Sequence, residues 1–325
     1  MAYANYSNGF ADGLIVRGVP LQVLHPGKVF YVSNASAAAL PGHKAGHDAG
    51  PGTFDEPFAT IDYAIGQCSG GRGDIIFVKP GYTQTLTLTT DIVLDVANVA
   101  IVGMGTGGLR PTLTYATNDT ANILVSAANI TLYNLLVVAN KAAVTSAFTV
   151  DGTSLATDLT IANCEFRDTS AILNFVTLLT GNATAQSLQG LHFVDNEIIS
   201  LGTTAATTAI KALEAASRIK LLRNFGTWAV LDDTAAFFAG SDKNFLQFEM
   251  GYNVLNKPNT SSDGGSFVSG TGTAWTGFAH HNLCWQLDNT AGIWIAAATK
   301  LAFSENYSPI TGAAEKSGLI NPAAV

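Results

Sequence analysis

Three close pairs of acidic residues are candidates for catalysis, because paired carboxylates are what glycoside hydrolysis requires. They are Glu165 with Asp168, Asp195 with Glu197, and Asp232 with Asp233. One carboxyl group of such a pair acts as general acid and the other as base or nucleophile. Glu165 and Glu197 each follow an asparagine closely, so we expect them on neighbouring coils if those asparagines stack. The preferred interpretation is that these acids face outward and keep the protein soluble, so we assign no catalytic residue.

Histidines offer a second kind of chemistry, metal binding. His43 and His47, with Asp48, have a spacing compatible with a metal ion, but they lie in the Gly/Pro-rich loop of residues 41–52. His280 and His281 are adjacent, and adjacent residues of a strand point to opposite faces. We therefore expect no metal site and no cofactor.

Aromatic residues near the C-terminus could stack on sugar rings. They are Trp275, Trp285 and Trp294, beside Phe278. Such residues more often fill a core or a subunit contact, so packing is the preferred interpretation.

The composition excludes several classes of partner. Of 325 residues, 47% are hydrophobic and 12% are charged, with a formal net charge of −8, whereas soluble domains carry roughly 25% charged residues. Lys and Arg are nowhere clustered, so we expect no nucleic-acid partner. No continuous apolar stretch predicts a signal peptide or a membrane span. The three cysteines, far apart in sequence, indicate no disulfide framework and favour synthesis in the cytosol.

Short apolar alternations that run into an asparagine recur through the chain. The asparagines are Asn134, Asn163, Asn196, Asn224, Asn253, Asn282 and Asn306, at intervals of 29, 33, 28, 29, 29 and 24 residues. Alternation with period two predicts a strand with one buried face, and Asn readily adopts a left-handed corner conformation. We therefore predict an all-β, single-stranded parallel β-helix, a solenoid whose coils stack. The repeated asparagines are predicted to be corner residues forming a structural ladder of stacked amides.

The segment PFATIDYAIGQC has apolar residues at helical spacing, with Pro57 in the first turn and Gly70-Gly71 beyond its end. A solenoid must cover the strand edges at its ends, so we predict that this short helix caps the N-terminal end. The predicted organisation is an N-terminal docking arm (1–29), a first strand, loop and capping helix (30–73), the β-helix (74–312) and a C-terminal tail (313–325).

The run from Phe30 to Ser33, the segment GPGTFDEPFATIDYAI and the segment RGDIIFVKPGYTQTLTL resemble the opening of the pectate-lyase-like right-handed β-helix superfamily. The match covers about residues 30 to 90 closely, and the remainder only through coil period and asparagine corners. The resemblance implies the right-handed fold and is less informative about function, because members include polysaccharide lyases and hydrolases, adhesins and trimeric virion proteins of tailed bacteriophages.

Low charge, the lack of a catalytic constellation and an arm that cannot form a core by itself favour a virion structural protein. We expect a non-enzymatic homotrimer, made in the host cytoplasm, that decorates or cements a bacteriophage capsid by binding other virion proteins, above all the major capsid protein. The alternative is a tailspike-like protein that binds or cleaves bacterial surface polysaccharide, with Glu165, Glu197 and Asp195 as its candidate catalytic residues.

Overall fold

The computed structural model describes most of the chain between residues 27 and 308. The described ranges are 15–16, 19–20, 27–151, 156–182, 187–201, 208–228, 236–240, 243–257, 267–269, 275–286, 295–296, 300–308 and 318–319. The predicted docking arm and C-terminal tail lie largely outside these ranges. Within the arm, β1 (Ile15–Val16) pairs with β2 (Val19–Pro20) in an antiparallel manner.

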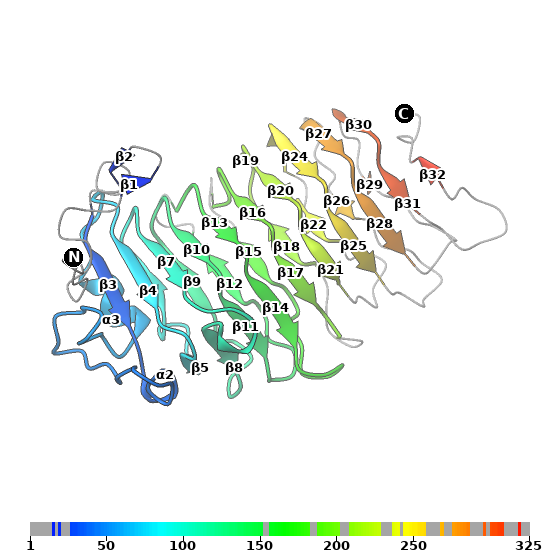
Figure 1. Ribbon diagram of the computed structural model, residues 1–325. Coiled ribbons are helices and arrows are strands. Elements are labelled where there is room, and N and C mark those ends of the chain that lie inside the picture. The colour runs from blue at the N-terminus through cyan, green and yellow to red at the C-terminus, as the bar shows by residue number, and fades with distance from the viewer. Residues whose placement is uncertain are drawn as a thin grey trace.

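Three sheets run along the length of the molecule, and successive strands of the chain visit them in turn (Figure 1). Within the described residues, sheet 1 contains β3 (Val29–Val32), β4 (Ile75–Val78), β7 (Ala100–Gly103), β10 (Thr131–Tyr133), β13 (Thr160–Ala162), β16 (His192–Val194), β20 (Lys220–Leu222), β24 (Phe248–Gly251), β27 (Thr276–His280) and β30 (Lys300–Ser304). All neighbouring strands of sheet 1 are parallel.

The other two sheets have the same design. Within the described residues, sheet 2 contains β5 (Thr83–Leu86), β8 (Thr112–Tyr115), β11 (Leu136–Ala139), β14 (Glu165–Asp168), β17 (Glu197–Ile199), β21 (Phe225–Thr227), β25 (Val254–Lys257), β28 (Leu283–Gln286), β31 (Tyr307–Ser308) and the antiparallel β32 (Gly318–Leu319). Sheet 3 contains β6 (Val93–Leu94), β9 (Ile123–Val125), β12 (Phe148–Val150), β15 (Leu179–Gly181), β18 (Ile210–Ala212), β22 (Phe238–Ala239), β26 (Val268–Ser269) and β29 (Ile295–Ala296). A short parallel pair, β19 (Ala216–Ser217) and β23 (Phe245–Leu246), adds to a corner.

This arrangement confirms the predicted all-β parallel solenoid. Each complete coil supplies one strand to each sheet, so a residue lies in register with residues about 30 positions away in sequence. Leu132, for example, pairs with Ile101 on one side and Ile161 on the other. The right-handed sense of the coil stays a prediction.

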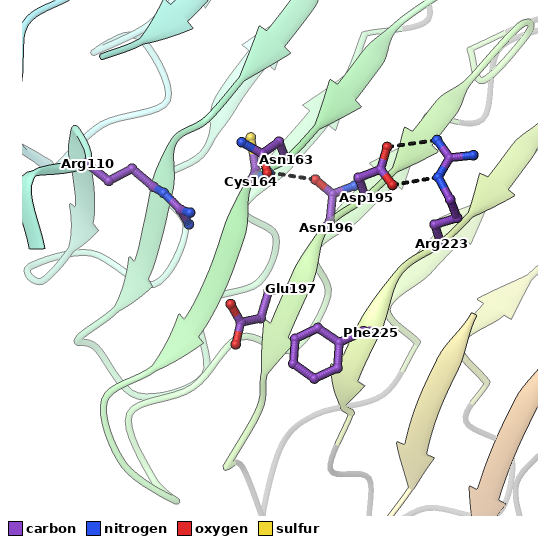
Figure 2. Close-up of a pocket in the computed structure, with 8 residues that line it drawn as sticks. All are labelled: Arg110, Asn163, Cys164, Asp195, Asn196, Glu197, Arg223 and Phe225. Atoms are coloured by element: carbon purple, nitrogen blue, oxygen red, sulfur yellow. Dashed lines mark hydrogen bonds and ion pairs between the residues drawn. The ribbon is translucent and has the colours of Figure 1, made fainter. Parts of the chain in front are cut away.

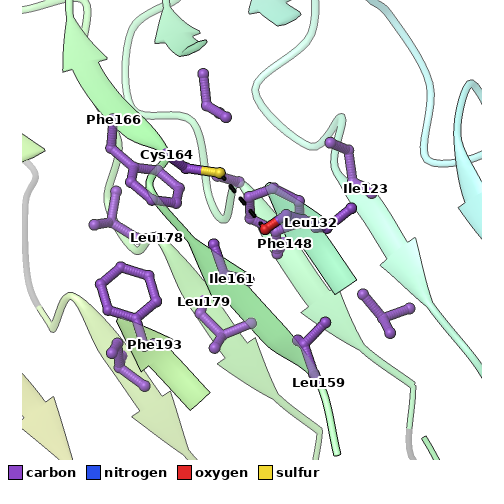
Figure 3. Close-up of a cluster of buried hydrophobic side chains, with 14 of the residues drawn as sticks. Ile123, Leu132, Phe148, Leu159, Ile161, Cys164, Phe166, Leu178, Leu179 and Phe193 are labelled. Atoms are coloured by element: carbon purple, nitrogen blue, oxygen red, sulfur yellow. Dashed lines mark hydrogen bonds between the residues drawn. The ribbon is translucent and has the colours of Figure 1, made fainter. Parts of the chain in front are cut away.

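The core fills the space between the three sheets, as the close-up in Figure 3 shows for the middle coils. Strands such as β7, β8 and β11 bury every second residue, which is the alternation that the sequence contains. Aromatic side chains contact one another from coil to coil, edge to face for Phe148 and Phe166 (ring centroids 6.0 Å apart) and tilted for Phe166 and Phe193 (5.6 Å). Each coil therefore buries its inner face against its neighbours.

Helix α3 (Ile61–Gly66) is shorter than the predicted capping helix and begins after Thr60, whose side chain accepts a hydrogen bond from the Tyr63 N–H. The preceding residues are extended, because Phe58 forms a parallel bridge with Val32 of β3. The helix contacts β3, β4 and β6, and its Asp62 accepts a hydrogen bond from the Val93 N–H at the edge of sheet 3. The capping role stays a prediction that these contacts support.

The remaining helical segments are single turns. They are α2 (Ala35–Ala38) and the 3₁₀ helix η1 (Gly107–Leu109). None of the described helices is long and apolar enough to cross a membrane.

Candidate functional site

At most of the corners between sheets 1 and 2, the left-handed residue is not the asparagine, as predicted, but the residue before it. Asn134 and Asn163 are left-handed, with φ of 58° and 54°. At the other five corners the left-handed residue precedes the asparagine; these residues are Asp195, Arg223, Tyr252, His281 and Glu305, with φ between 52° and 57°. The prediction that the asparagine itself takes the left-handed conformation is therefore wrong for Asn196, Asn224, Asn253, Asn282 and Asn306. Their side chains are instead directed inward, where they replace hydrogen bonds that the bent backbone cannot make.

These five asparagines form a buried ladder along the corner. Each of the first four donates from its backbone N–H and its Nδ2 to Oδ1 of the next asparagine, at 2.8–3.1 Å. Each Nδ2 also donates to a main-chain carbonyl of sheet 1, as Asn253 does to Leu221. All five are at most 1% exposed. The ladder satisfies buried polar groups that would otherwise destabilise the fold.

Asn163 and Asn134 lie outside this ladder, because they occupy the left-handed position. The residue level with Asn196 is Cys164, whose N–H donates to Asn196 Oδ1 at 3.0 Å. Asn134 uses its Nδ2 to bond the carbonyls of Gly103 and Gly105. Asn163 reaches Asn134 Oδ1 only at 3.4 Å.

Glu165 and Glu197 are in-register neighbours at the start of β14 and β17. Glu197 lines a groove of about 220 Å³ on the corner of sheets 1 and 2 (Figure 2). The groove is lined by Arg110, Asn163, Cys164, Asp195, Asn196, Glu197, Arg223 and Phe225. The structure thus brings together all three low-ranked catalytic candidates, two of which line the groove.

Arginines neutralise two of these three carboxylates. Glu165 is almost fully buried and forms ion pairs with Arg110, at 3.2 Å, and with Arg167. Asp195 accepts two hydrogen bonds from Arg223, at 2.6 and 2.8 Å. Among the described residues Glu197 has no ion-pair partner, and in Figure 2 it lies between Arg110 and Phe225. Of the two carboxylates that line the groove, Asp195 is therefore ion-paired and Glu197, within the described part of the chain, is not.

The other acidic candidates do not join the groove. Asp168 is buried, where its Oδ1 accepts from the Phe175 N–H and its Oδ2 from Ser200 and the Leu201 N–H. These bonds fix the loop after β14, which accounts for an acid at this position. Asp232 and Asp233 lie outside the described residues.

The candidate metal ligands, Asp48 and the histidines, make contacts within the protein. Asp48 accepts hydrogen bonds from the main-chain N–H groups of Ala59 and Thr60, so it holds the chain entering α3 rather than a metal ion. The rings of His280 and His281 touch, with their Nδ1 atoms 3.1 Å apart. The expectation that they point to opposite faces is wrong, because His281 is left-handed and lies after the end of β27, where strand alternation no longer applies. In the described part of the chain, no group of three or more His, Cys, Asp or Glu is placed to hold a metal.

Of the aromatic candidates, Trp275 is buried against Phe238, Phe245 and Phe248, and its Nε1 donates to the Lys243 carbonyl at 2.8 Å. Phe278 is partly exposed and stacks on His280, with ring centroids 4.7 Å apart. The side chain of Trp285, and Trp294 as a whole, lie outside the described residues.

A row of exposed apolar side chains continues the groove along sheet 2, and the sequence interpretation missed it. The apolar row consists of Phe225, Val254, Leu283 and Tyr307, which are Cα partners in consecutive strands. Each follows a ladder asparagine directly in the sequence. The repeated Asn-apolar dipeptide could have indicated this row in the sequence. It was missed because an apolar residue at the start of a strand is ordinarily assigned to the core.

Comparisons with known proteins concern the fold. No protein-family model matches this sequence, and no curated protein matches it. A solved structure of a rhamnogalacturonan lyase is similar with a TM-score of 0.56 and 13% identity, covering 87% of this chain and 74% of that chain. A GH136 lacto-N-biosidase from Eubacterium ramulus gives a TM-score of 0.37 and 10% identity, covering 87% of this chain and 68% of that chain. The likeness to the rhamnogalacturonan lyase, at 13% identity, shows the fold alone, and it fits a pectate-lyase-like parallel β-helix.

Proposed function

We propose that this protein is a non-enzymatic structural component of a tailed-bacteriophage particle, synthesised in the host cytoplasm and assembled as a homotrimer that decorates the capsid. The observation that carries the proposal is the apolar row on sheet 2, which exposes four large side chains in line. Exposed apolar patches on soluble proteins mark interaction sites. Only 12% of the residues are charged, which also suits a surface partly buried in an assembly.

The groove beside the row supports a non-enzymatic role. Glu165 and Asp195 are both engaged by arginines, so their charges organise the corner. A glycoside hydrolase uses one carboxyl group as general acid and a second as general base or nucleophile. The major capsid protein is the proposed partner in the particle.

Immunogold labelling of purified phage particles with antibodies to this protein tests the proposal. We expect label on the head. Label confined to the tail tip would replace capsid decoration with a spike, and particles without label would overturn both assignments. Preimmune serum on the same particles is the control.

A tailspike-like polysaccharide-binding or depolymerising protein is the second candidate. The unpaired Glu197 favours it, because this carboxylate lies in the groove beside the exposed ring of Phe225 and could act on a bound sugar. Purified protein would then release reducing ends or unsaturated uronates from bacterial surface polysaccharide, and Glu197→Gln would abolish that release. An inactive wild-type protein excludes the enzymatic form of this candidate.

A further inference from the structure

The apolar row has the geometry of a contact that repeats along the solenoid. Phe225, Val254, Leu283 and Tyr307 are 53%, 48%, 41% and 49% exposed, and each occupies the first position of its sheet 2 strand. Neighbouring parallel strands are spaced about 4.8 Å apart. The row is therefore one side chain wide, runs parallel to the solenoid axis and lies next to the corner with sheet 1.

We propose that the apolar row is the surface through which copies of this chain pack side by side, around an axis parallel to the solenoid. The inference rests on the homo-oligomer in the proposed function and names the face that forms it. A second copy presents the same side chains at the same spacing. When two rows face each other at the same height along the solenoid axis, each apolar side chain therefore meets the same residue of the other copy.

Charge along the row defines where this contact can form. Around a common axis each residue meets the same residue of its neighbours, so a charged row would repel itself. The row is uncharged over its four members, and the next position toward the N-terminus is Glu197. Carboxylates from neighbouring copies would converge there. The contact is therefore confined to the C-terminal half of the solenoid, from β21 to β31.

The area of the row suits the apolar centre of an interface. A half-exposed aromatic side chain offers roughly 100 Å², and Val254 and Leu283 are smaller, so the four members offer roughly 300 Å². Stable interfaces bury roughly 800 Å² per partner, with a polar rim around an apolar centre. Thr227 and Asn256, two residues further along β21 and β25 and half-buried, supply such a rim.

Sedimentation of the full chain at micromolar concentration tests this assignment. We expect wild-type protein to be oligomeric, and Val254→Glu to raise the dissociation constant at least tenfold, because it places a charge at the centre of the row. Ile172→Glu is the matched control, since Ile172 is 62% exposed but lies outside the row. This control should associate like the wild type.

Cross-linking keeps the test informative if Val254→Glu fails to fold. In Val254→Cys, a short bis-maleimide should join copies covalently, whereas wild-type protein, with only the half-buried Cys68 accessible, should stay uncross-linked. Oligomeric wild type with no effect of Val254→Glu and no cross-link at residue 254 overturns the assigned face and leaves the proposed function standing. Monomeric wild type at every concentration overturns this face together with the homotrimer, while head labelling of particles still tests the capsid role.

Discussion

The two halves of the solenoid build the same corner with different chemistry. In the N-terminal half, the position after the left-handed residue is occupied by Leu135 and Cys164, and charged groups lie beside it. In the C-terminal half, the same position holds the asparagine ladder from Asn196 to Asn306, and from Asn224 onward the next residue is exposed and apolar. The backbone follows the same path at this corner in both halves. The side chains therefore determine which half exposes a row of apolar residues.

Buried charges are concentrated in the first half. Asp74 is fully buried and accepts hydrogen bonds from Arg72 and from the N–H groups of Lys28 and Ser69. Lys79 is also buried, where its Nζ donates to the Phe54 carbonyl and lies 4.0 Å from the centre of the Phe54 ring. Desolvation lowers the pKa of Lys79. The first half therefore depends on ionised groups, and the second on uncharged amides.

Removing one amide from the ladder should give the largest loss of stability. In Asn253→Ala, the N–H and Nδ2 of Asn224 lose their acceptor in a buried corner. Each unsatisfied buried group costs about 1–3 kcal/mol, so we expect a loss of about 2–4 kcal/mol in the free energy of unfolding. Urea denaturation measures it.

The matched control for this variant is Asn163→Gly in the other half. Glycine tolerates the left-handed backbone of residue 163, and only the 3.4 Å bond to Asn134 is lost. We expect a change below about 1 kcal/mol. Equal losses for the two variants would contradict the distinction between ladder and corner asparagines.

The second largest effect we expect is a difference in acid sensitivity between the two halves. Burial opposes ionisation of Asp74, but the Arg72 guanidinium and two backbone N–H donors outweigh it and lower its pKa. A carboxylate with a lowered pKa stabilises the fold above its unfolded pKa of about 3.9, and that contribution is lost as the pH falls through the folded pKa. Hydrogen-exchange protection should therefore fall in β4 before it falls in β20 and β24.

Asp74→Asn checks the cause of this acid sensitivity. The variant should lose about 1–3 kcal/mol at neutral pH and become less sensitive to acid, since it has no charge to lose. Asp119→Asn, at an exposed position, is the control and should leave the pH profile unchanged. Simultaneous loss of protection in both halves of the wild type would show that charge does not distinguish them.

Extending the apolar row by one strand should strengthen association. Glu197→Phe adds an apolar side chain level with Phe225, and burying it on association is worth about 1–1.5 kcal/mol, or roughly tenfold in the dissociation constant. Sedimentation equilibrium measures the change. Glu197→Gln separates the loss of charge from the gain of area, and weaker association of Glu197→Phe would count against the row as a contact.

The exposed ion pair between Arg223 and Asp195 should contribute least to the free energy of unfolding. Arg223 and Asp195 are each about half exposed, so their bidentate pair is screened by water. We expect Arg223→Ala to change the free energy of unfolding by less than about 1 kcal/mol, an effect that salt reduces further. A loss of several kcal/mol in chemical denaturation would show that the ladder depends on this pair.

The sequence by itself determined the solenoid, because period-two alternation and the recurring asparagine are local properties of each coil. It also indicated that the asparagines stack, although it placed Asn163 level with Asn196. Only the tertiary structure decided that Cys164 occupies that level, that Glu165 is paired with Arg110 and Arg167, and that residues such as Val254 face outward. The physical reason is register. Coils of 24 to 33 residues differ in loop length, and a shift of one residue exchanges the corner, the ladder and the exposed row.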